Sequence, residues 1–296
     1  MWKPPASLHS YTRQRGVRAF GPLVACMRTQ KQGDDRYYVN DDTGERYPGV
    51  TSIIGTRAKP FLQRWAARLS AELAVDALPY LQQLAERDRA GAIAFLANAA
   101  QRYTKQRGEI GSEAHIIFER MIRGQSVDHV PAGMEPYRAN FAEFLAAVNP
   151  ELVRAEDIVV SDTYGYAGSF DVWLNVWLDG NGIPTPDRSG VAKLVLADWK
   201  TGKKTYPEVG LQLGAYANAD YVMAPDGTRD ALPVFDGFYV LHITAEGWEF
   251  VPITVTERDF DVFVSLLHIF NWNSRHVIGK PVVGSGEVQT GTERRA

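Results

Sequence analysis

The chain has 296 residues and a formal net charge of −3, with 45% hydrophobic and 23% charged residues. This balance is typical of a globular protein with one large domain or a domain with an added lobe. The single cysteine, Cys26, excludes a disulfide within the chain and a zinc or iron–sulfur site built on several thiolates, and it favours a reducing, cytoplasmic location. No run approaches the roughly 18 to 20 apolar residues of a membrane span. The charge counts only modestly against a nucleic-acid partner, because basic residues can be confined to a groove.

The first third of the chain predicts a small hairpin followed by a mostly helical lobe. Residues 1–35 show little periodicity and predict an irregular segment. Turn-forming residues from Asn40 to Gly44 separate two short stretches with strand character, and apolar residues then recur at helical spacing. The predicted elements are a hairpin over 36–47 and helices over 60–77 and 78–103, the last split at Pro79 and Gly91. We therefore expect an N-terminal lobe over residues 1–103.

The rest of the chain predicts a second domain, over 104–278, in which a mixed central sheet is flanked by helices. Its predicted helices cover 104–123, 136–148 and 207–222, with a closing helix capped by Thr256, and its strands cover 152–161, 166–178, 191–200, 234–242 and 248–254. This order is typical of an α/β fold. The final segment, 279–296, has almost no large apolar residues and is predicted to be disordered.

Residues 194–204 join an apolar strand to charged residues and a glycine turn: Leu-Val-Leu-Ala-Asp-Trp-Lys-Thr-Gly-Lys-Lys. Because side chains alternate along a strand, Asp198 and Lys200 share one face and Trp199 points to the other. Charges at the end of a buried strand are costly unless they are paired or bind an ion. A salt bridge at the strand end is the simpler interpretation of this pair, and an ion site is the functional one.

Asp171 follows a glycine-containing stretch in the preceding predicted strand. If the two strands pair, Asp171 and Asp198 converge, and two carboxylates repel unless a cation lies between them. Oxygen ligands suit Mg²⁺ or Mn²⁺. Lys200 would point at the same ion, where its charge could stabilise the negative charge that develops on phosphorus.

Three further groups have both a structural and a functional interpretation. Gln212 and Tyr216 share a helix face after the strand, and either bind a phosphate and position the lysine or form an ordinary surface pair. His115 lies on one helix face with two glycines, and is either a ligand or a core histidine. Glu156 is either an additional acid of the site or an edge charge.

These residues resemble the ordered motifs of RecB-type nucleases of the PD-(D/E)XK (restriction-endonuclease-like) superfamily, and most closely phage-encoded exonucleases akin to the CRISPR-associated RecB-like exonucleases. The stretches that carry the resemblance are Gly108-Glu109-Ile110-Gly111-Ser112-Glu113-Ala114-His115, Glu156, Gly168-Ser169-Phe170-Asp171, Asp198-Trp199-Lys200-Thr201-Gly202 and Gln212-Leu213-Gly214-Ala215-Tyr216. Each motif is weak alone, and five in the family's order are more specific.

The resemblance implies a role for each matching position. His115, Asp171, Asp198 and the Trp199 carbonyl would bind Mg²⁺ or Mn²⁺, with Glu156 as the least secure ligand. Lys200 would be the catalytic lysine. Gln212 and Tyr216 would organise the site or contact DNA, and the nearby Lys203 and Lys204 are further candidates for DNA binding. The middle acid is Asp198 where Glu is commoner, and the iron–sulfur cysteines of several relatives are absent.

The resemblance therefore implies a divalent-metal-dependent DNA exonuclease in the bacterial host cytoplasm, acting on a single strand or a duplex end. By analogy it also suggests a role in phage DNA recombination, replication or repair, beside a strand-annealing protein. A structure-directed endonuclease of the same superfamily and a nuclease fold that only binds DNA are the alternatives.

Overall fold

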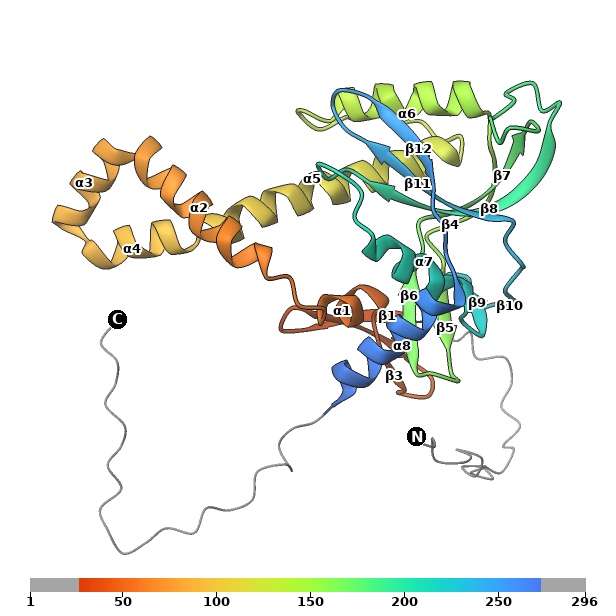
Figure 1. Ribbon diagram of the computed structural model, residues 1–296, viewed down its shortest axis with the longest axis horizontal. Coiled ribbons are helices and arrows are strands. Elements are labelled where there is room, and N and C mark those ends of the chain that lie inside the picture. Colours follow the sequence, from red (N-terminus) through yellow and green to blue (C-terminus); the bar gives the residue numbers. More distant parts are fainter. Residues whose placement is uncertain (1–26, 273–296) are drawn as a thin grey trace, which may run out of the picture.

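The computed structural model describes residues 27–272, which form a mixed α/β fold with a helical lobe at one side (Figure 1). Its helices are α1 (Val50–Gly55), α2 (Phe61–Asp76), α3 (Leu78–Arg87), α4 (Arg89–Ala97), α5 (Ala99–Ile122), α6 (Glu135–Val148), α7 (Glu208–Ala217) and α8 (Glu257–Asn271). Its strands are β1 (Met27–Gln32), β2 (Asp35–Asn40), β3 (Arg46–Pro48), β4 (Glu151–Ala155), β5 (Ile158–Ser161), β6 (Tyr166–Ser169), β7 (Val172–Leu178), β8 (Val191–Lys200), β9 (Tyr221–Met223), β10 (Arg229–Ala231), β11 (Gly237–Ile243) and β12 (Trp248–Pro252).

The largest sheet has the strand order β12-β11-β8-β7-β4, with β8 at its centre. Strand β8 pairs antiparallel with β7 and parallel with β11, so the sheet is mixed as the sequence predicted. Both faces of β8 are covered. Val195, Ala197 and Trp199 pack in the cluster with α5 and α6, whereas Leu196 packs in the cluster with α1, α7 and α8. This alternation puts Asp198 and Lys200 on the α7 face.

Two smaller sheets extend the structure below the central sheet in Figure 1. One is antiparallel with the order β10-β9-β5-β6, and the other is the N-terminal sheet β1-β2-β3. They meet where Tyr38 and Tyr47 pack against Val160 and Ala167. The backbone N–H of Ser169 donates to the Tyr38 hydroxyl at 2.9 Å, so the N-terminal sheet is fixed directly beside the β6–β7 connection.

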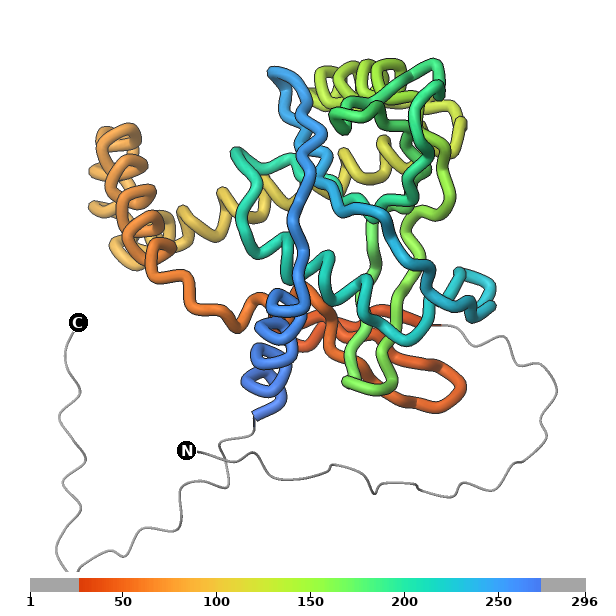
Figure 2. The backbone as a smooth tube through the Cα atoms, turned by 45° about the vertical axis from the view of Figure 1, so that its right-hand side comes forward, coloured from red at the N-terminus to blue at the C-terminus, as the bar shows by residue number. Residues whose placement is uncertain are grey.

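Helices α2, α3 and α4 form a lobe on the N-terminal part of α5 and stand apart from the sheets in both ribbon and tube views (Figures 1 and 2). Aromatic contacts hold the lobe together: the Trp65 and Tyr103 ring centroids are 5.7 Å apart, and those of Tyr80 and Phe95 are 5.5 Å apart. No residue of α2 is fully buried. Helix α5 runs without a break across the predicted domain boundary at residue 103 and joins the lobe to the central sheet.

Several predicted elements differ from the structure for local reasons. The predicted strand over 152–161 divides at Glu156, and the one over 166–178 divides at Phe170–Asp171, because the chain passes there between the five-stranded and four-stranded sheets. The helix predicted to end at residue 222 ends at Ala217, where Asn218 donates its side-chain N–H to the Gly214 carbonyl. Part of the segment predicted to be irregular forms β1.

Other predictions are confirmed. Thr256 and Asp259 form a capping box at the start of α8, and β2 and β3 form the predicted hairpin. Cys26 and the predicted tail over 279–296 lie outside the described residues. Among residues 27–272, no helix is long and apolar enough to cross a membrane.

Candidate metal and catalytic site

The predicted site residues come together in one cleft of about 500 Å³ on the α7 side of β8. His115 comes from α5, Glu156 from the β4–β5 connection and Asp171 from the β6–β7 connection. Asp198 and Lys200 lie at the end of β8, and Gln212 and Tyr216 lie on α7; all of these side chains line the cleft. Gly108 and Gly111 lie on the same face of α5 as His115 and also line the cleft. Because glycine has no side chain, this face of α5 leaves space in front of His115.

The imidazole of His115 lies between two carboxylates. Its Nδ1 is 3.4 Å from Asp171 Oδ1 and 3.9 Å from Glu156 Oε1, and its Nε2 is 3.2 Å from the Trp199 carbonyl oxygen. Burial lowers the pKa of His115, but Asp171 and Glu156 outweigh burial and raise that pKa to about 10. One ligand atom from each of His115, Glu156 and Asp171 can be chosen so that all lie within 4.8 Å of one another, a group that could hold a metal ion.

Glu156 occupies an unusual backbone conformation at this group. Its φ of 58° lies in the left-handed region, which costs energy for a residue with a side chain. Its backbone N–H donates to the Asp171 carbonyl at 3.1 Å, so the turn at Glu156 is tied to the neighbouring ligand. Burial raises the pKa of the Glu156 carboxyl, and the nearby His115 opposes that rise.

Asp171 is held in one orientation. Its Oδ2 accepts a hydrogen bond from the backbone N–H of Trp199 at 2.5 Å, while its Oδ1 faces His115. Burial raises the pKa of Asp171, but the charges of His115 and Lys200 and the Trp199 hydrogen bond outweigh it, so the net pKa is lowered. The carboxylate therefore stays ionised at neutral pH.

Asp198 and Lys200 form an ion pair in the same cleft. Burial raises the pKa of Asp198 to about 6 although Lys200 opposes the change. Burial lowers the pKa of Lys200, but the charges of Asp198 and Asp171 raise it overall, so Lys200 is cationic at neutral pH. The Gln212 side-chain N–H donates to Asp198 Oδ1 at 2.8 Å and to the Tyr216 hydroxyl at 3.1 Å, which fixes the buried carboxylate.

No protein-family model matches this chain, and no curated protein shows significant sequence similarity to it. What the site can do is therefore argued from its own chemistry.

The predicted metal ligands lie in two neighbouring sets in the structure. Glu156, the least secure assignment from sequence, belongs to the three-residue group, whereas Asp198 lies beside that group and faces Lys200 and Gln212. Lys203 and Lys204 are exposed on the loop after β8 and do not line the cleft.

The sequence interpretation missed Arg36 and Thr51, which line the cleft from the N-terminal sheet and α1. No local pattern marks these residues, since only the packing of the N-terminal sheet against β6 brings them near the site. Ser169, which also lines the cleft, already stood in the motif that contains Asp171.

Proposed function

We propose that the protein is a divalent-metal-dependent deoxyribonuclease with a PD-(D/E)XK-type core, acting as an exonuclease. The observation that carries the proposal is the grouping of His115, Glu156 and Asp171 beside the ionised Asp198–Lys200 pair in one open cleft. A simple strand-end salt bridge would account for Asp198 and Lys200, but it would leave a histidine and two more acids at the same place without a role.

The donor atoms fit a divalent cation that displaces the proton of His115, since a histidine must be neutral to bind a metal ion. Two carboxylates and one imidazole converge, and the buried Asp198 Oδ2 has an ionic contact to Lys200 but no hydrogen bond among the described residues. Carboxylate oxygens suit both Mg²⁺ and Mn²⁺, and an imidazole nitrogen is a better ligand for a transition-metal ion than for Mg²⁺, so we expect Mn²⁺ to be favoured over Mg²⁺. A bound ion would supply Lewis-acid stabilisation of the phosphoryl oxygens and a more acidic water.

The side chains of the chain itself supply positioning and charge. His115, Glu156 and Asp171 would hold the ion, with Asp198 beside them. The Lys200 ammonium is 35% exposed in its side chain, so it can approach a phosphate from the cleft and stabilise negative charge that grows in the transition state. Gln212 keeps the Asp198 carboxylate in place through its hydrogen bond.

The test uses end-labelled linear DNA and a covalently closed circle, each with Mn²⁺, Mg²⁺ or EDTA. We expect metal-dependent loss of the linear DNA alone, and a rate about 10² to 10³ times lower in the Lys200→Ala variant. Lys193→Ala, on the same strand but outside the cleft, is the matched control and should cleave like the unchanged protein.

Each other outcome points to a different function. Cleavage of the closed circle would favour a structure-directed endonuclease, because an exonuclease needs an end. Binding of DNA without hydrolysis in any metal would favour a nuclease fold that only binds DNA. Full activity of folded Lys200→Ala would remove the catalytic assignment.

A further inference from the structure

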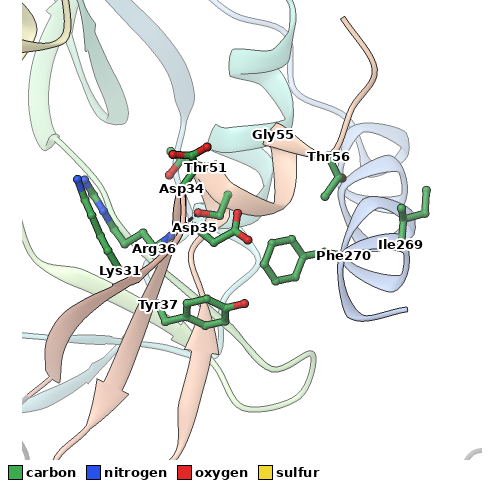
Figure 3. Close-up of a pocket in the computed structure, with 11 residues that line it drawn as sticks. Lys31, Asp34, Asp35, Arg36, Tyr37, Thr51, Gly55, Thr56, Ile269 and Phe270 are labelled. Atoms are coloured by element: carbon green, nitrogen blue, oxygen red, sulfur yellow. Dashed lines mark hydrogen bonds between the residues drawn. The ribbon is translucent and has the colours of Figure 1, made fainter. Parts of the chain in front are cut away.

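The structure has a second hollow, of about 600 Å³ (Figure 3). It lies between the β1–β2 turn, α1 and the end of α8, and we call it the flanking hollow. Arg36 and Thr51 line both the flanking hollow and the catalytic cleft, so one surface continues from one to the other. A nucleotide chain bound in the catalytic cleft could therefore continue past Arg36 and Thr51 into the flanking hollow.

The hollow has aromatic walls. The rings of Tyr37, on β2, and Phe270, on α8, line it with centroids 6.0 Å apart and planes inclined at 56° (Figure 3). Both side chains are partly exposed. The Arg46 guanidinium lies 3.6 Å from the Tyr37 ring centroid and covers one face of that ring, so Phe270 and the uncovered part of Tyr37 form the aromatic surface that a ligand can reach. Bases of single-stranded nucleic acids stack on aromatic side chains of this kind.

Negative and positive side chains line different parts of the hollow, and they favour different parts of a nucleotide. Asp34 and Asp35 both line it, and their carboxylates would repel a phosphate and accept hydrogen bonds from an amino group. Arg36, at the boundary with the catalytic cleft, and Lys31, whose side chain extends to the same side in Figure 3, offer the positive charge that a phosphate needs. This arrangement suits a nucleotide whose phosphate stays at the boundary while its base enters the hollow.

We propose that the flanking hollow binds one unpaired base next to the phosphodiester in the catalytic cleft, and that it favours bases with an exocyclic amino group. The inference rests on the proposed function and adds to it a preference for single-stranded DNA. The volume lies within the range of about 300 to 1,000 Å³ that encloses one small-molecule ligand, which matches a single nucleotide. A base that is still paired and stacked in a duplex has no free face to stack on the aromatic rings of the hollow.

The test measures binding in Ca²⁺ by fluorescence anisotropy, with single-stranded hexamers of deoxycytidine, thymidine and an abasic sugar–phosphate of equal charge. Uniform sequences remove any uncertainty about register. We expect the deoxycytidine hexamer to bind about 5- to 150-fold more tightly than the abasic one, the range expected from stacking of one base. It should also bind more tightly than the thymidine hexamer, which carries a carbonyl oxygen where cytosine has its amino group.

Two variants assign these differences to the hollow. Phe270→Leu keeps an apolar side chain and should reduce the ratio between deoxycytidine and abasic hexamers. The paired substitution Asp34→Asn and Asp35→Asn should reduce the ratio between deoxycytidine and thymidine hexamers. Phe250→Leu, the same substitution on β12 and outside both cavities, is the matched control and should change neither ratio.

The result that overturns the inference is a Phe270→Leu variant with the same ratios as the unchanged protein. If that protein still hydrolyses DNA in a Lys200-dependent way, the inference fails alone and the proposed function stands. If the ratios depend on Phe270 but Lys200→Ala cleaves normally, the proposed function fails and the hollow remains a base-binding site. Failure to bind any hexamer would overturn the inference alone, because hydrolysis of end-labelled linear DNA and its dependence on Lys200 test the proposed function separately.

Discussion

Replacing Gly168 by alanine should lower both the stability and the activity of the protein. Gly168 lies on β6, and a Cβ atom there would be 2.6 Å from Tyr216 Cε1 and 2.9 Å from Val50 Cγ2. Carbon atoms in favourable contact are about 3.5 to 4.0 Å apart, so α7, α1 or both must move by roughly 1 Å. Overpacking of this kind costs about 1 to 3 kcal/mol. For a chain of this size, that corresponds to a fall in Tm of about 2 to 12 °C.

The same displacement should reach the catalytic cleft. The Tyr216 hydroxyl accepts a hydrogen bond from Gln212, and Gln212 holds Asp198. A misplacement of about 1 Å can reduce catalysis by up to about 10²-fold, so we expect slower hydrolysis even below the unfolding transition.

Thermal unfolding and initial hydrolysis rates measure the two effects of Gly168→Ala. Gly108→Ala is the control for stability, because Gly108 lies inside α5 with no atom within 4 Å of its Cβ position. That variant should be neutral or more stable by about 0.5 to 1 kcal/mol, since alanine favours a helix interior over glycine. An unchanged Tm and rate for Gly168→Ala would refute the close packing of Tyr216 and Val50 against β6.

Three further predictions concern the cleft. Gln212→Ala should slow hydrolysis about 10- to 100-fold without changing the circular dichroism spectrum, because Asp198 loses its orienting hydrogen bond, and an unchanged rate would contradict this role. Glu156→Gln should weaken Mn²⁺ binding at least about tenfold in calorimetry without DNA, while Glu119→Gln, also in the cleft but outside the ligand group, should not. In EDTA, His115 should stabilise the protein below pH 6.5 and lose that contribution as the pH rises through about 10, because its folded-state pKa is raised. The Tm difference from His115→Asn should shrink over that range, and a constant difference would contradict the ion contacts.

The parts of the fold that sequence periodicity predicted are those with a simple burial pattern. Strand β8 is buried on both faces and ends in charged residues, so its position and the side of Asp198 and Lys200 could be predicted. The breaks at Glu156 and at Asp171 could not, since they depend on where the chain changes sheets. Polar residues and glycine interrupt the apolar residues at both breaks, but nothing in this local pattern indicates that the chain passes to another sheet there.

In the candidate site, too, residues within a local sequence pattern could be predicted, and residues brought in by long-range packing could not. The shared side of Asp198 and Lys200 could be predicted from strand alternation, whereas His115 and Gln212 had a structural interpretation as well and became site candidates through the resemblance to an ordered set of motifs. Arg36 reaches the cleft only through the pairing of β2 with its neighbours and the contact of that sheet with β6. Long-range packing of this kind leaves no local pattern in the sequence. The side of the cleft formed by α5, β8 and α7 could therefore be predicted, and the side formed by the N-terminal sheet and α1 could not.

Helix α5 gives the lobe a mechanical connection to the site. Its first turn packs in the lobe, where Tyr103 contacts Trp65, and His115 lies about 24 Å from the start of the helix at 1.5 Å per residue. The half of α5 that carries His115 packs against the central sheet through Ala114, Ile117 and Phe118, and its other half packs in the lobe. One continuous helix thus anchors the lobe to the element that carries His115, so the direction of this helix sets where the lobe stands relative to the cleft.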